Sequence, residues 1–229
     1  KDNYDPEQIT YNNRNKAMKV LFLFNIALTQ VTEKDNFFPF DRFYNVENWN
    51  IEHILAKNDD GLKDAKEFES FSKTTKQLIK KAKSETGNKK ISEKNLYAID
   101  KLIEELDNFI REKNKNQCRL KSREVNEKLF EIFQIDDFNN LCLLDATTNK
   151  KVGKRQFKEK RDITLRLHDE IDLESNAYLP IGTRLVFSKQ ATPSKDYQPN
   201  YWSFKDRACY FDKVKDSIRE FLDNEVNGN

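Results

Sequence analysis

The chain has 229 residues, with 41 Lys and Arg against 39 Asp and Glu, and a formal net charge of +2. Hydrophobic residues make up 37% and include 17 Phe, which is enough apolar material for a packed core and excludes a disordered chain. The balanced charge excludes a uniformly basic nucleic-acid-binding protein, so any such surface must come from local clusters of Lys and Arg.

The three cysteines, Cys118, Cys142 and Cys209, are odd in number and far apart. They form neither a disulfide framework nor a CxxC pair, which predicts a cytoplasmic protein without structural zinc. The longest apolar run, from Val20 to Leu28, is too short to span a bilayer, so we expect no membrane partner. Because the chain begins at Lys1, we expect it to be part of a longer protein.

The first half of the chain contains three kinds of segment. Apolar spacing predicts a largely buried helix over 14–31, then an aromatic-rich turn over 37–43 that covers it. Residues 49–55 are β-branched and aromatic enough to predict a short buried strand. Residues 58–134 are rich in Lys and Glu and repeat apolar residues at helical spacing, which predicts a three-helix insertion with a break at 86–88.

The second half begins with a predicted short strand over 140–144 and a turn over 145–148, followed by a basic helix at about 153–167. The C-terminal part, 170–229, is expected to hold a strand and a helix. The strand is predicted at 183–187 and the amphipathic helix at about 204–222, with Tyr210, Phe211, Val214, Ile218, Phe221 and Leu222 on its inner side. Together the segments predict a single, mostly helical α+β domain over 1–229.

The candidate site combines a Glu-His pair in the first strand with two asparagines nine positions apart after the insertion. Phosphodiester hydrolysis needs a base to activate water and a cation to stabilise charge on the phosphate. Neutral imidazole suits the base near pH 7, so His53 is the candidate. Oxygen ligands suit Mg²⁺, which makes Glu52 and Asn149 the candidate ligands. Asn140 would hold the His53 ring or backbone by hydrogen bonds.

Neighbouring strand residues point to opposite faces, so Glu52 and His53 meet at one site if the strand ends or bends there. Each residue also has an ordinary alternative. A histidine beside apolar residues is most often structural, and Glu52 suits a surface position. Asn140 and Asn149 suit turns and helix caps.

These motifs resemble the HNH (His-Me finger) nuclease domain of the GmrSD-type restriction family, prokaryotic systems that attack modified phage DNA. The resemblance runs through Phe38-Pro-Phe, Trp49-x-Ile-Glu-His-Ile, Asn139-Asn140-Leu-Cys-Leu-Leu, Asn149 and Phe157-Lys-Glu-Lys160, and more loosely through Trp202 and Asp206-Arg207. It implies a small ββα-metal finger embedded in helices, whose two halves are separated by the long insertion. The family usually has Pro shortly after the His, where this chain has Ala56-Lys57.

The resemblance also implies residue roles and a function. It makes His53 the general base and Asn140 the orienting residue, and it places Lys160 near the scissile phosphate. It makes Glu52 and Asn149 ligands of Mg²⁺ or Mn²⁺. The implied function is a cytoplasmic endonuclease module that nicks double-stranded phage DNA. An N-terminal NTPase and modification-sensing domain or subunit would lie outside this chain, and double-strand breaks would need an oligomer or two events.

A basic cluster follows the second asparagine. It comprises Lys150, Lys151, Lys154, Arg155, Lys158, Lys160 and Arg161. A charge run is usually a solvated helix face, but beside a phosphate-cleaving centre we interpret it as a clamp on DNA phosphates. Two other classes stay open: a non-catalytic DNA-binding or regulatory module that keeps the finger as a scaffold, and a helical module whose 58–134 segment docks a partner subunit. An RNA substrate is also compatible with these residues.

Overall fold

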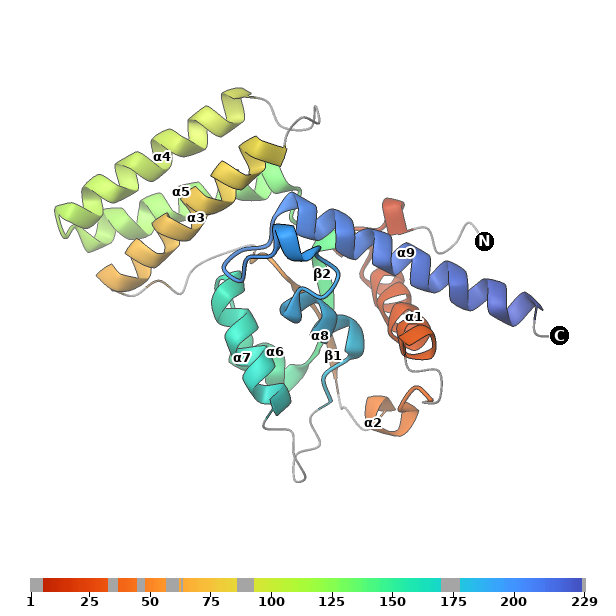
Figure 1. Ribbon diagram of the computed structural model, residues 1–229. Coiled ribbons are helices and arrows are strands. Elements are labelled where there is room, and N and C mark those ends of the chain that lie inside the picture. The colour runs from red at the N-terminus through yellow and green to blue at the C-terminus, as the bar shows by residue number, and fades with distance from the viewer. Residues whose placement is uncertain are drawn as a thin grey trace.

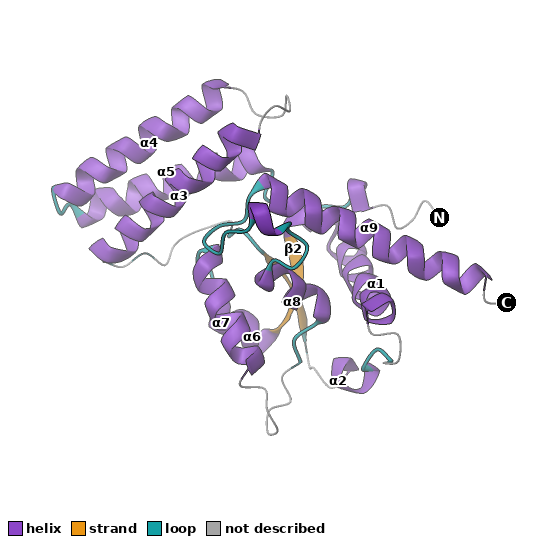
Figure 2. Cartoon of the chain, viewed as in Figure 1, coloured by secondary structure: helices purple, strands orange, loops and turns teal. Residues whose placement is uncertain are grey.

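The computed structural model describes residues 6–32, 37–44, 48–56, 62, 64–85, 93–169 and 178–227. Figure 1 and Figure 2 show a mostly helical α+β fold in which a small sheet lies among the helices. The predicted fold class is therefore confirmed at this level. No helix within the described ranges is long and apolar enough to cross a membrane.

The sheet consists of β1 (Trp49–His53) and β2 (Leu141–Asp145), which pair antiparallel with His53 opposite Leu141. Both strands were predicted, and β1 ends at His53. All five residues of β2 are buried, which explains its unbroken Leu-Cys-Leu-Leu run. The two strands are neighbours in space although the whole insertion separates them in sequence.

The main core lies where α1 (Arg14–Thr32) and α9 (Phe204–Asn227) pack side by side (Figure 1). Both helices were predicted. The ring of Phe24 lies edge-on to that of Tyr210, with centroids 5.9 Å apart. The prediction that Leu222 lies on the inner side of the last helix is wrong, because this residue is exposed beyond the end of the core. The aromatic turn forms α2 (Phe40–Tyr44), and its rings pack against α1 as expected.

The predicted strand over 183–187 is wrong: these residues lie in α8 (Ile181–Ser188). A short apolar run suits either element, so periodicity alone does not separate them. A buried hydrogen bond at its first turn favours the helix, since the Gly182 N–H donates to the Asn25 Oδ1 atom at 2.8 Å. The Thr183 hydroxyl then donates to the Leu143 carbonyl at 2.6 Å and ties α8 to β2.

The predicted turn over 145–148 is also wrong. The Asp145 carboxylate accepts hydrogen bonds from the N–H groups of Thr147 and Thr148, both at 2.9 Å, and so caps the helix α6 (Ala146–Val152). Gly153, with φ of 55°, ends α6, and α7 (Phe157–Asp169) follows. The basic segment therefore forms two helices with a sharp break between them rather than one.

The insertion forms the three predicted helices, α3 (Ala65–Glu85), α4 (Glu93–Arg111) and α5 (Lys115–Phe133). They have an apolar core of their own, separate from the main one. The predicted break at 86–88 lies outside the described residues. Leu55, just after β1, packs against both cores, so the chain passes from one to the other directly beside the candidate site.

Short 3-10 turns complete the described fold: η2 (Pro6–Gln8), η3 (Tyr11–Asn13), η4 (Phe138–Asn140) and η5 (Ser194–Asp196). Two of them matter for the site. The turn η3 places Tyr11 beside the end of β1, and η4 leads directly into β2. Both ends of the insertion therefore meet at the end of β1.

Candidate active site

His53 lies at the end of β1 in a buried position. Its Nε2 atom is 2.8 Å from the Asp136 Oδ1 atom, and the Tyr11 ring covers it with centroids 4.4 Å apart. Burial lowers the pKa of His53 below 6.5, and this effect outweighs the opposing hydrogen bond and charge of Asp136. The imidazole is therefore neutral near pH 7, the state in which it accepts a proton.

Asn140 holds the backbone that directly follows His53. Its side-chain Oδ1 accepts from the Leu55 N–H at 2.8 Å, and its Nδ2 donates to the Leu55 carbonyl at 3.1 Å. The same amide donates to the Ile135 carbonyl at 2.9 Å, while the Asn140 carbonyl accepts from the Ile54 N–H at 2.8 Å. The orienting contact of this buried asparagine is thus with the backbone after His53 and not with its ring.

Lys160 of α7 lies beneath the end of β1. Its fully buried ammonium group donates to the Glu52 Oε1 atom and, at 2.6 Å, to the His53 carbonyl. These bonds stabilise the end of β1 and pair the ammonium group with the Glu52 carboxylate. The sequence did not reveal these contacts, and a fully buried ammonium has no exposed surface from which to make the expected contact with a phosphate.

The side chains of Glu52 and His53 leave β1 on opposite faces, as strand alternation requires. Glu52 pairs with Lys160 on one side, and His53 pairs with Asp136 on the other. Ending the strand at His53 therefore does not by itself turn the two side chains toward each other. Glu52 and His53 both lie at the end of β1, where hydrogen bonds from Lys160 and Asn140 fix the backbone.

Asn149 lies on the second turn of α6, the helix that follows β2 and packs against both strands. Its side chain is half-buried, and among the described residues no hydrogen bond joins it to Glu52. Within the same ranges no cluster of three or more His, Cys, Asp or Glu side chains is placed to hold a metal. The oxygen donors of Glu52 and Asn149 suit a hard cation that keeps most of its water ligands.

The basic residues gather where α6 ends and α7 begins. Those that are exposed there are Lys150, Lys151, Lys154, Arg155 and Lys158. The Arg155 guanidinium also caps α6, since it donates to the Lys151 carbonyl at 2.6 Å. Arg161 is half-buried and donates to the Tyr197 hydroxyl at 3.2 Å. The surface that can reach a phosphate is therefore carried mainly by lysines at this corner.

Sequence reasoning missed two residues at the site, Asp136 and Tyr11. Both contact His53 across long stretches of chain, and no spacing rule links them to it. The acidic pair that follows the insertion, Asp136-Asp137, is the one local signal that was available.

Known proteins give no further guide to the site. No family model, curated protein or solved structure matches the chain. The assignment of function therefore depends on the geometry of these residues and on the resemblance of their motifs.

Proposed function

We propose that the chain is a divalent-metal-dependent DNA endonuclease of the HNH type, with His53 as its general base. The observation that carries the proposal is a buried imidazole, bonded to a carboxylate, at the end of β1, and burial lowers its pKa below 6.5. The order β1, β2 and α6 supports a ββα finger, with the Asn149 side chain on its helix.

A cation at this site would stabilise the negative charge that develops on the phosphate and on the leaving oxygen. Glu52 would hold it together with Asn149. Lys160 bonds the Glu52 Oε1 atom, and among the described residues Oε2 has no bonding partner. The second oxygen is therefore suited to a cation while the first stays on Lys160.

The protein's own groups carry out the proton transfer and positioning. His53 takes a proton from the attacking water, which a neutral imidazole does well near pH 7. Asn140 and Lys160 keep the strand end rigid, so that the base stays in a fixed place. The exposed lysines of α6 and α7 would hold the DNA backbone without reading its sequence.

The biological setting follows from the resemblance alone. We place the chain in a cytoplasmic anti-phage restriction system, where an NTPase or sensor unit outside this chain licenses cutting. Because one finger makes one cut, the chain by itself is expected to nick. An oligomer or two successive events would then produce a double-strand break.

The test is cleavage of supercoiled plasmid by the purified chain with Mg²⁺, Mn²⁺ or EDTA. We expect metal-dependent conversion to open circles before any linear product appears. The matched control is His53→Ala, shown by circular dichroism to be folded, and it is expected to be inactive. Cleavage that persists in this variant would rule out His53 as the base, and immediate linearisation would rule out nicking by one finger.

A further inference from the structure

The short segment between α5 and η4 brings a carboxylate to His53. The helix α5 ends at Phe133, and Gln134, with φ of 44°, turns the chain so that Asp136 faces the end of β1. The Asp136 Oδ1 atom then lies 2.8 Å from His53 Nε2. Among the described residues this is the one hydrogen bond that the imidazole makes.

This contact determines which ring nitrogen carries the proton. An ionised carboxylate only accepts hydrogen bonds, so the proton between the two groups is on Nε2. In a neutral imidazole the other nitrogen then has the lone pair. Nδ1 is therefore the atom that can accept a proton from water.

We propose that Asp136 is the positioning residue of the site: it holds His53 as the Nε2–H tautomer and leaves Nδ1 as the base. The proposal rests on the nuclease function inferred above. Asp136 does not touch the substrate in this scheme. It acts through the ring, whose orientation and tautomer it sets by one hydrogen bond.

The surroundings of Asp136 support a positioning role, because the backbone of its turn is fixed on two sides. The Tyr11 N–H donates to the Asp136 carbonyl at 2.7 Å, so the residue that covers the His53 ring also binds the turn. Asn140 joins the Ile135 carbonyl to the backbone of Leu55. A single asparagine thus links the segment before Asp136 to the segment after His53.

Arg207 of α9 holds the same turn from behind. Its buried guanidinium donates to the Gln134 carbonyl at 3.0 Å and to Asn139 Oδ1 at 2.7 Å. It also donates to the Phe133 carbonyl at the end of α5. Such a fully bonded support is what keeps a hydrogen-bonded ring in one orientation.

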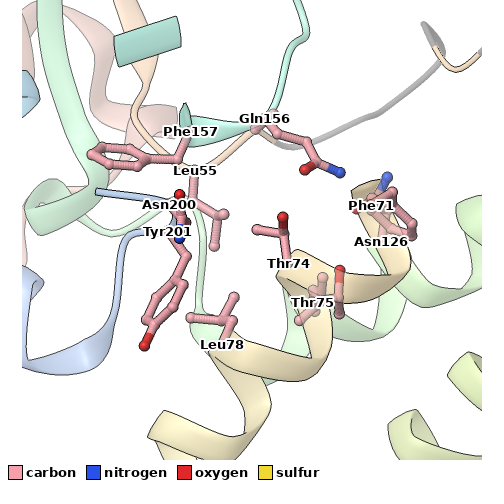
Figure 3. Close-up of a pocket in the computed structure, with 12 residues that line it drawn as sticks. Leu55, Phe71, Thr74, Thr75, Leu78, Asn126, Gln156, Phe157, Asn200 and Tyr201 are labelled. Atoms are coloured by element: carbon pink, nitrogen blue, oxygen red, sulfur yellow. The ribbon is translucent and has the colours of Figure 1, made fainter. Parts of the chain in front are cut away.

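A neighbouring cavity does not offer a competing site for the substrate. It lies between Leu55 and Phe157 on one side and Thr74 and Leu78 of α3 on the other (Figure 3). Its volume of about 40 Å³ suits water rather than a nucleotide.

The experiment combines ring spectroscopy with kinetics on Asp136→Asn. The asparagine keeps the shape of the aspartate, but its amide can donate to Nε2 and so favour the Nδ1–H tautomer. Asp137→Asn is the matched control, since it makes the same change one residue along. The chain has two histidines, so His168→Gln assigns the ¹⁵N ring signals of His53. Spectra are recorded without metal at about pH 8, where imidazoles are neutral.

We expect the Nε2–H pattern in the wild type and in Asp137→Asn, and a shift toward Nδ1–H in Asp136→Asn. The kcat for plasmid nicking should fall by about 10- to 100-fold in Asp136→Asn while KM stays within about 2-fold. An Nδ1–H pattern in the wild type overturns the proposal. So does an Asp136→Asn variant whose tautomer is unchanged.

The spectra separate this proposal from the nuclease itself. If the wild type cleaves no DNA under any metal condition, the proposed function fails, and the tautomer shift alone decides the role of Asp136. If Asp136→Asn does not fold, the tautomer of the wild type decides that role. A tautomer shift with unchanged kcat in an active enzyme also refutes the proposal, because the ring would then not need this orientation.

Discussion

Replacing Lys160 by Met should strongly destabilise the part of the chain that is built on the main core, outside the insertion. The substitution keeps the length and most of the volume of the side chain but removes its charge. Glu52 would lose its ammonium partner while 16% of its side chain is exposed, and the His53 carbonyl would lose a buried donor. Breaking a buried ion pair by removing one partner typically costs about 3–5 kcal/mol. Because water still reaches part of Glu52, we expect about 3 kcal/mol.

The double variant Glu52→Gln/Lys160→Met shows whether the lost charge is the cause. Removing both charges of a buried pair is often nearly neutral. The orphaned His53 carbonyl still costs about 1 kcal/mol. The double variant should therefore be about 2 kcal/mol more stable than Lys160→Met.

The assay is urea unfolding followed by tryptophan fluorescence. Trp49 on β1 and Trp202 both belong to the main core, so they report on the part of the chain built on it and not on the insertion. With a slope of about 2–3 kcal/mol/M, the Lys160→Met midpoint should fall by about 1 M with the slope unchanged. A loss below about 1 kcal/mol, or a double variant no more stable than the single one, would refute the buried-pair argument.

Three further predictions concern pH, packing and DNA. Burial lowers the pKa of His53 in the folded state, so the unfolded chain binds this proton more readily and the free energy of unfolding should fall as pH drops below 6.5. Urea midpoints measured across that pH range should fall less steeply with decreasing pH in His53→Gln than in the wild type. Gly182→Ala should cost about 1–3 kcal/mol in the same unfolding assay, because its Cβ would lie 2.7 Å from a ring carbon of Phe24, and unchanged stability would contradict this close packing. Lys150→Gln/Lys151→Gln should weaken DNA binding equally for unrelated sequences and reduce the slope of log K against log salt by about 2; an unchanged slope would remove these lysines from the interface.

The long helices α1, α3, α4, α5 and α9 were predictable because each carries its own signal. The insertion repeats apolar residues at helical spacing, and this pattern alone identifies the positions that are buried in its core. The segment 183–187 was not predictable, because its helix depends on a hydrogen bond from the Gly182 N–H to Asn25, which lies far away in the sequence. The helix α6 was missed although its capping residue, Asp145, stood directly before it.

At the candidate site, local sequence placed His53 in the first strand and Asn140 at the start of the second. It did not reveal what each side chain contacts. Asp136 and Lys160 reach β1 from opposite directions, and both contacts depend on how the helices pack. A pattern in one dimension identifies candidate groups, whereas the direction in which a group points is a property of the whole fold.

The position of the insertion has a consequence for the order of folding. The helices α3, α4 and α5 make mainly local contacts with one another, so they can form early. Pairing β1 with β2 must close a loop that contains all of them, and a preformed helical unit shortens the flexible part of that loop. During synthesis, β2 and the turn that carries Asp136 leave the ribosome only after the insertion. The contact between His53 and Asp136 is therefore formed late, after the insertion has been made.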